Sequence, residues 1–433
     1  MSMSPGGSRG PTGLLPSLLL CAVSAACATT SAVRAPSPDE IPALEARVEA
    51  SPRDGEGLIL LGAAYREAGR LDEARETLEE ATQVAPGSAD AVFFLGLTYE
   101  DMGSYEAAGG LYRRYLQLNP TGAMADEIRD RVALVRRMEV QQAVRAAVER
   151  EQELADTPPN PATIAVFPFP FEGGSSDLEP LGMALSGMIA TDLAQSSRLT
   201  VLERSQLQAL MDEIALGRTG LVDQQTAARS GRILGAGRIV QGRVAGDEAQ
   251  LSLDAAVIEV GPQDAQAASV EAQDALDRLF DLEKQLVLGI FDAMGVTLTP
   301  AERERVTQRR TENLEALLAY GRGIDASYRG SNAEAARHFS EAARIDPGFT
   351  DAAVEAQESE SVASASSTGT AELAQQSTDV AADVDLIQQD ALEAVERAAD
   401  WNPRRDSPVV GEGALPTITS VRIIIRRPSG GGR

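Results

Sequence analysis

The sequence is poor in the residue types on which most catalytic and metal sites depend. It contains one histidine, one lysine and only two cysteines, which are His338, Lys284, Cys21 and Cys27. A zinc site needs a cluster of Cys and His ligands, and a phosphate-binding loop needs a Gly-Lys-Ser/Thr sequence. Neither can be built here, and two cysteines near one terminus give no disulfide framework. We therefore expect no metal, no cofactor and no enzymatic activity.

Positive charge and aromatic side chains are also scarce. Lys and Arg total 39 against 65 Asp and Glu, the formal net charge is −26, and aromatic residues make up 4% of the chain. A protein that binds nucleic acid needs a basic face to displace phosphate counterions. The acidic balance therefore excludes nucleic acid as a partner and disfavours anionic lipid surfaces. The 433 residues are enough for two or three domains.

The N-terminus has the pattern of an export signal. Arg9 precedes an apolar run from Leu14 to Ala26, which is too short to span a membrane as a helix. Small residues at 24–26 then precede Cys27, an arrangement that resembles the lipobox of bacterial lipoproteins, although Ser24 stands where leucine is usual. We predict a signal over residues 1–27 with Cys27 as the lipid anchor. Plain secretion, with cleavage near Ala26 or Ala28, is the alternative.

Two segments repeat at an interval of 34 residues. Leu61, Gly62, Tyr65, Ala74, Ala81 and Pro86 return as Leu95, Gly96, Tyr99, Ala108, Tyr115 and Pro120. This order and spacing match the tetratricopeptide pattern, in which Gly and Ala allow two antiparallel helices to approach closely. We predict repeats over residues 39–122, with Gly69 and Gly103 at the turns. The first helices of such repeats line a groove for a partner helix or peptide, here around Leu58, Arg66, Phe93 and Glu100.

Two further helical regions are related to these repeats. Residues 123–160 contain a long pattern that we interpret as a connecting helix, with a coiled-coil partner helix as the alternative. Residues 301–354 contain a third, atypical repeat, because Gly323, Ala335, Phe339 and Pro347 keep the offsets. His338 lies beside Phe339 on this repeat, so a spacer role is expected rather than membership of a catalytic triad.

Between residues 161 and 300 the periodicity changes to alternating strands and helices. Strands are predicted over 163–169, 199–202, 238–244, 250–260 and, less clearly, 266–273. Helices are predicted over 181–193, 226–234 and 276–294, and another begins at a capping box formed by Ser205 and Gln208. This order predicts a second, α/β domain.

Four motifs in this region resemble the CsgG family of curli production and transport proteins. They are residues 164–169 (IAVFPF), 199–207 (LTVLERSQL), 226–236 (TAARSGRILGA) and 239–242 (IVQG). The resemblance implies an α/β domain in the bacterial periplasm and a tendency to assemble. It makes Phe167, Pro168, Phe169, Glu203 and Arg204 candidate assembly residues. Each also has a structural interpretation, since the phenylalanines suit a core and Glu203 with Arg204 suits an ion pair at a helix start.

This chain is not expected to form the secretion pore of that family. Residues 239–275 are used almost entirely by the three strands of the predicted soluble sheet, with short acidic turns between them.

The tail over 355–433 is acidic and of low complexity up to Asp385, so it is expected to be disordered or loosely helical. A short helix is predicted over 387–399. A strand is predicted over 417–425, which could join this protein's own sheet, pair with a partner or stay exposed.

The sequence therefore predicts an α+β multidomain protein, in which all-α tetratricopeptide repeats accompany a CsgG-like α/β sandwich with a mixed sheet. The expected function is a non-enzymatic scaffold or adaptor in the cell envelope. Its expected partners are envelope proteins or peptides and a second copy of the chain, and a lipid anchor is its only expected membrane contact. A subunit of a CsgG-type outer-membrane secretion or assembly complex is the alternative.

Overall fold

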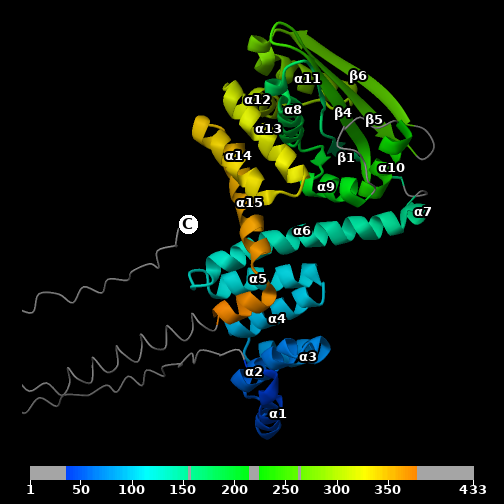
Figure 1. The fold of residues 1–433 in the computed structure, drawn as a ribbon. Helices are drawn as coiled ribbons and strands as arrows, with labels where there is room; N and C mark the ends of the chain where they lie inside the picture. The colour runs from blue at the N-terminus through cyan, green and yellow to red at the C-terminus, as the bar shows by residue number, and fades with distance from the viewer. Residues whose placement is uncertain (1–35, 155–157, 214–223, 262–264, 378–433) are drawn as a thin grey trace, which may run out of the picture. The chain divides into compact units, whose positions relative to one another are not determined.

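The computed structural model describes residues 36–154, 158–213, 224–261 and 265–377 (Figure 1). The predicted lipid-anchor residue Cys27 lies outside these ranges, as do the helix predicted over 387–399 and the strand predicted over 417–425. Among the described helices, none is both long enough and apolar enough to cross a membrane.

The N-terminal part is a stack of antiparallel helices. After a short 3-10 turn, η1 (Pro38–Glu40), the helices are α1 (Ile41–Ala50), α2 (Gly55–Glu67), α3 (Leu71–Val84), α4 (Ala89–Asp101) and α5 (Tyr105–Leu118). Each of α2 to α5 packs against the next one along the chain. The same hydrogen bond occurs in both repeats. Tyr65 and Tyr99 each donate a hydroxyl hydrogen bond to a glutamate 20 residues earlier.

Small residues allow the helices of each pair to approach closely. A Cβ placed on Gly96 would lie 2.7 Å from the ring of Tyr112, and one on Gly62 would collide with Leu78. The turns within the pairs are made by Gly69 and Gly103, whose φ values of 73° and 72° suit glycine. The packing and turn residues predicted from the 34-residue spacing are therefore found in the structure.

A long helix, α6 (Ala125–Glu149), connects the repeats to the second domain and is followed by the short α7 (Glu151–Leu154). It packs against α5 at one end and against α9 and α10 at the other. Val144 is buried there in a small apolar cluster with Leu210 and Ile233. The coiled-coil alternative is not needed for this segment, because these contacts within the chain cover its apolar face.

The second domain is built on a mixed six-stranded sheet in the order β3-β1-β4-β5-β6, with β2 also paired to β4. The strands are β1 (Asn160–Val166), β2 (Phe171–Glu172), β3 (Thr200–Val201), β4 (Ala236–Gly246), β5 (Leu251–Val260) and β6 (Ala265–Asp274). Pairs among β1 to β4 are parallel, whereas β4, β5 and β6 are antiparallel neighbours. The fold class predicted from the sequence is confirmed. The two-residue strand β2 was not predicted.

Helices pack on this sheet and complete the domain. They are α8 (Leu181–Leu193), α9 (Arg204–Glu213), α10 (Gln224–Leu234) and α11 (Leu279–Ala293), and the 3-10 turns η2 (Ser176–Leu178) and η3 (Leu276–Arg278) precede two of them. The helix α11 packs against β5 and β6, α10 against β4 and β5, and α8 against β1 and β4. Apolar residues from all these elements form one continuous core.

The third helical pair shares this core and does not form a separate one. After α12 (Pro300–Thr307), the helices α13 (Leu314–Tyr328) and α14 (Asn332–Ile345) pack against each other, and α13 packs against α8. Tyr320 and Phe339 belong to the same apolar cluster as the sheet residues. A Cβ on Gly323 would lie 2.5 Å from the Phe339 ring, so this pair uses the same glycine contact as the first two repeats.

The acidic segment that follows differs from the sequence prediction. Residues from Glu355 onward were expected to be disordered or loosely helical, but α15 (Thr350–Ser367) is a regular helix packed against α14 and α6. Its buried positions are Ala352, Ala356, Ser359, Val362 and Ala365. These mostly small residues at intervals of three and four form a narrow contact face on the helix. The low-complexity composition of the segment makes this face hard to recognise in the sequence.

Candidate functional site

The four predicted groove residues of the repeats are buried by other parts of the chain. Leu58 and Phe93 are 1% and 2% exposed, and Arg66 and Glu100 are each 7% exposed. Arg66 forms an ion pair with Asp101 at 2.7 Å. Glu100 accepts hydrogen bonds from the Tyr112 hydroxyl at 2.7 Å and from Arg131 Nε at 2.9 Å. These residues are brought together as predicted, but they do not line an open groove.

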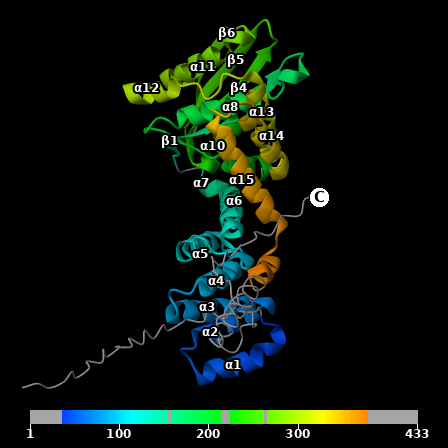
Figure 2. The same cartoon turned by 90° about the vertical axis from the view of Figure 1, so that its left-hand side faces the viewer.

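A distant part of the chain covers this face of the repeats. Arg131 donates to the backbone carbonyl of Ala365, at 2.9 Å, and to that of Thr368. Thr370 donates its hydroxyl to Asp101 at 2.6 Å, and Leu373 and Ala374 join the apolar cluster that contains Phe93. Figures 1 and 2 both show this segment, in orange, beside α4.

The motif residues Glu203 and Arg204 lie at a polar cavity of about 320 Å³, which α6, α9 and α15 line together with residues of α13 and α14. Arg204 donates two hydrogen bonds to Glu355, at 2.7 and 3.0 Å. Burial alone would lower the pKa of Arg204, but the charge of Glu355 raises it above its ordinary value. Glu203 forms an exposed ion pair with Arg136. Both motif residues therefore make ion pairs between helices, and they do not pair with each other.

A second arginine in this cavity is held by side-chain amides. Arg137 donates to Asn332 Oδ1 at 2.6 Å and to Gln208 Oε1 at 2.9 Å. Burial lowers the pKa of Arg137, and burial also raises the pKa of Glu358 in the same cavity. The cavity thus contains cations and anions in similar number, which suits a polar helix junction better than a site for one charged ligand.

Phe167 and Phe169 are core residues, each 1% exposed. They follow β1, and Phe167 N–H donates to the Val240 carbonyl of β4 at 2.8 Å. A Cβ on Gly242 would collide with the Phe169 ring, so the first and fourth motifs pack on each other. Phe169 and the adjacent Pro168 are therefore placed by packing within the domain.

Phe169 also borders a cleft of about 750 Å³ between the loop before α8 and the helices α13 and α14. One wall is mainly apolar and includes Phe171, Pro180 and Met183, and the other wall is charged and consists of Arg322, Asp325, Arg329, Glu334 and His338. His338 lies 3.6 Å from Glu341 and 3.9 Å from Glu334 on its own helix. It therefore faces the cleft and not the core.

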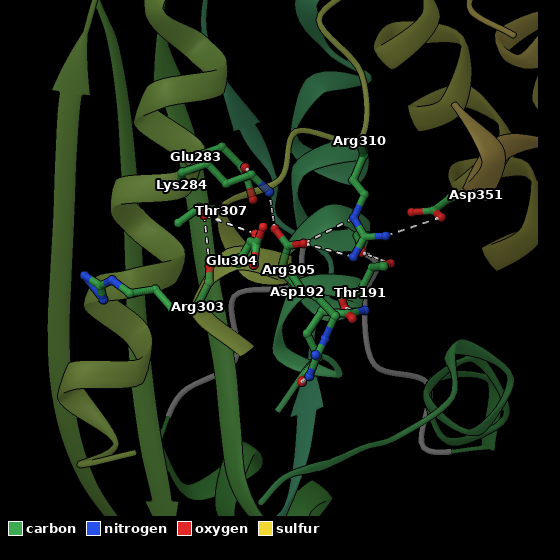
Figure 3. Close-up of polar contacts among 12 residues, drawn as sticks. Thr191, Asp192, Glu283, Lys284, Arg303, Glu304, Arg305, Thr307, Arg310 and Asp351 are labelled. Atoms are coloured by element: carbon green, nitrogen blue, oxygen red, sulfur yellow. Dashed lines mark hydrogen bonds and ion pairs between the residues drawn. The ribbon is translucent and has the colours of Figure 1, made fainter. Parts of the chain in front are cut away.

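The sequence reasoning missed a buried cluster of charges centred on Asp192 of α8 (Figure 3). Lys284 and Arg310 contact the Asp192 carboxylate from two sides, and the Arg310 guanidinium lies 3.3 Å from it. Arg310 also lies 3.8 Å from Asp351. Lys284 Nζ is 3.2 Å from a Glu283 oxygen, an ion-pair distance without hydrogen-bond geometry. The only signal in the sequence was the single lysine of the chain, Lys284, which follows Glu283 within α11.

Burial controls the ionisation of this cluster. Burial, together with the charge of Asp192, raises the pKa of Glu283 to about 8 even though the charge of Lys284 opposes the shift. Burial likewise raises the pKa of Asp351. The carboxyl groups of Asp192 and Glu283 are fully buried, so a solute could reach them only through a local opening of the fold. The arrangement ties α8 and α11 to the segment that leads into α13.

Comparison with known protein families identifies both parts of the chain. Residues 140–281 match the family described as curli production assembly/transport component CsgG, and residues 41–123 match a tetratricopeptide repeat family. The chain carries a CsgG-family domain preceded by tetratricopeptide repeats. The resemblance inferred from the four sequence motifs is confirmed by this result. The match to the CsgG family begins within α6 and ends within α11.

No curated protein is similar enough to be matched to the chain. Among solved structures, the C-terminal domain of LpoB from Salmonella enterica is similar over 31% of this chain and 98% of its own length. The sequence identity is 15% and the TM-score is 0.23.

The CsgG-family domain and the repeats together indicate a protein related to envelope assembly or transport that has protein-interaction repeats. Within the described ranges, no group of three or more His, Cys, Asp or Glu residues is arranged to bind a metal ion. The charged clusters of the CsgG-family domain lie at helix junctions, around Asp192 and around Arg204. Their geometry is that of structural contacts between helices.

Proposed function

We propose that this protein is a non-enzymatic scaffold or adaptor of the cell envelope. In this proposal the tetratricopeptide repeats bind partner proteins, and the CsgG-like domain docks on an envelope complex or assembles with further copies. The observation that carries the proposal is the role of α6, which packs against α5 of the repeats and against α9 of the CsgG-family domain. A partner bound to the repeats would thereby be held next to an assembly domain.

The electrostatic contacts along α6 support this proposal. Arg131 connects α6 to Glu100 of α4, and Arg137 connects it to Gln208 of α9. A shift of the repeats that moved α6 would break hydrogen bonds at both ends. This arrangement suits a protein that positions one partner relative to another and catalyses no reaction.

Photo-crosslinking in living cells tests the adaptor function. A crosslinking amino acid is introduced at Glu106 on the exposed surface of α5, and a matched control carries it at Glu304 on the exposed surface of α12. We expect an envelope protein, identified by mass spectrometry, to be captured from position 106 and not from position 304. The proposal is wrong if positions spread over the repeats capture no envelope protein.

The proposal also places the protein on the periplasmic side of a membrane, held by a lipid on Cys27. The sequence 24–27 supports this anchor, with small residues before the cysteine. Incorporation of labelled fatty acid into the wild-type chain, and its loss in the Cys27→Ala variant, is the expected result. Release of both chains in soluble form on cell fractionation would contradict the anchor.

A second candidate function is a subunit of an outer-membrane secretion or assembly complex, which the description of the matched family favours. The mass of the detergent-solubilised protein separates the two functions. A large ring-sized oligomer that forms only in detergent would support the secretion complex. A monomer or small oligomer that becomes soluble in the Cys27→Ala variant would support the adaptor.

A further inference from the structure

The segment that covers the repeats is a separate element at the end of α15. The helix α15 ends at Ser367, and Thr368 takes an extended conformation with φ −111° and ψ 118°. A new helix then begins, because residues 370–377 are helical and the Leu373 N–H donates to the Gly369 carbonyl at 2.9 Å. We refer to residues 368–377 as the docked segment. A Cβ on Gly369 would meet nothing within 4 Å, so no neighbouring atom packs against this side of the joint.

The docked segment contacts the repeats through one face of its helix. Leu373 and Ala374 are 2% and 4% exposed, whereas the neighbouring Ala371 and Glu372 are exposed. The two buried side chains belong to the apolar cluster formed by α2 to α6. A helix that buries adjacent small and large apolar residues on one side has the character of a peptide that binds in a helical groove.

Polar contacts fix the direction and register of the segment. At its start, Thr370 donates its hydroxyl to Asp101, and Asp101 is also paired with Arg66 at 2.7 Å. The carboxylate of Asp101 therefore lies at the N-terminal end of the docked helix, where the helix dipole favours a negative charge. Arg131 holds the carbonyl of Thr368 just before it. The recognised pattern is a hydroxyl residue at the helix start, followed after two residues by leucine and a small residue.

The contact is small enough to be exchanged. Within the described residues it rests mainly on one leucine, one alanine and a few hydrogen bonds, far fewer residues than the roughly 20–30 that each side of a stable protein–protein interface contributes. The segment is also attached in cis through Gly369, which gives it a high effective concentration at its site. A partner helix would therefore need either higher affinity or a longer contact surface to replace it.

We propose that this face of the repeats is a helix-binding site, which the chain fills with its own residues 368–377 until a partner helix of the same pattern displaces them. This inference rests on the proposed adaptor function for its partner, but the self-contact can be tested without one. The docked segment then acts as a competitor that sets a threshold of affinity for partners.

The test measures binding of a fluorescent peptide with the sequence of residues 366–377 to the purified full chain, by fluorescence anisotropy. In the Leu373→Asp variant a charge would have to be buried in the apolar cluster, so the docked segment should leave its site. We expect this variant to bind the peptide about 10-fold more tightly than the wild type, because the competent fraction of the chain rises. The same peptide carrying Leu373→Asp should not bind.

The matched control is Ala371→Asp, which adds the same charge on the exposed side of the same helical turn. It should bind the peptide as weakly as the wild type does. The milder Leu373→Ala variant keeps the test decisive if the charged variant fails to fold, and its affinity should lie between the two. Equal affinity of a folded Leu373→Ala or Leu373→Asp variant and the wild type would overturn the inference.

Comparison with the in-cell crosslinking separates this inference from the proposed function. Tight peptide binding by the Leu373→Asp chain without any captured envelope protein would leave the helix-binding site standing and reject the adaptor. Capture of a partner at equal yield by the wild type and the Leu373→Asp variant would leave the adaptor standing and reject the competition.

Discussion

A buried carboxyl group illustrates how a single residue makes the fold sensitive to pH. Glu283 is fully buried, and burial raises its pKa from an ordinary value of 4.5 to about 8. The folded chain therefore keeps a proton on this residue at pH values where the unfolded chain has lost it. Stability from this group is complete below about pH 4.5 and is lost as the pH rises through about 8.

We expect the Glu283→Gln variant to be more stable than the wild type at pH 8, by on the order of 4 kcal/mol, and to differ little at pH 4.5. The amide stays neutral at every pH, so it removes the cost of the buried acid. Urea unfolding at a series of pH values measures the difference. The exposed Glu304→Gln variant is the control. A Glu283→Gln advantage that did not depend on pH would show that Glu283 is ionised in the fold.

At the level of the element, glycines decide how closely the repeat helices pack. Gly96 of α4 faces Tyr112 of α5, whose side chain is fully buried and bonded to Glu100. Gly110 lies on the exposed side of α5, and a methyl group added to it would meet no neighbour within 4 Å. The same Gly→Ala change should therefore have opposite effects at the two positions.

We expect Gly96→Ala to destabilise the protein by about 1–3 kcal/mol, because the new methyl group would have to displace a packed tyrosine ring. Gly110→Ala should stabilise it by about 0.5–1 kcal/mol, since alanine has the higher helix propensity and meets no obstacle. Thermal unfolding followed by circular dichroism measures both. A loss of stability in Gly110→Ala would mean that α5 is covered by a further contact.

In the whole molecule, the ion pair between Arg204 and Glu355 joins α9 to α15, at the cavity that α6 also lines. It is partly buried, with side-chain exposures of 22% and 26%, and has two hydrogen bonds. The Arg136–Glu203 pair at the same cavity is more than half exposed on both sides. Exposed pairs of this kind contribute little to stability, so the two pairs form a natural comparison.

A double-mutant cycle should give a coupling of about 1–2 kcal/mol for Arg204→Ala with Glu355→Ala, and less than about 0.5 kcal/mol for Arg136→Ala with Glu203→Ala. Hydrogen exchange in residues 350–367 should also accelerate in Arg204→Ala. Both effects follow if the pair holds α15 in place. Additive single changes with unchanged exchange would show that apolar packing alone holds this helix.

The sequence by itself determined the local structure and the order of the parts. The 34-residue spacing placed the helices around Gly62 and Gly96, and alternation placed the strands β4 and β5, because each pattern depends on contacts near in sequence or on one face of one element. Four short motifs were enough to indicate the CsgG family. Residues of two of these motifs, Phe169 and Gly242, pack against each other in the domain.

Only the tertiary structure decided which of these surfaces are covered. The groove residues Arg66 and Glu100 were predicted to be accessible. Arg131 and residues 365–374 cover them, and the second of these segments lies more than 200 positions further along the chain. The ion pairs around Asp192 and Arg204 were also decided by the tertiary structure, because their partners are 92 to 151 residues away. Such contacts have no sequence period, since they depend on where whole elements meet. These contacts determine whether the groove is open or is occupied by the chain itself.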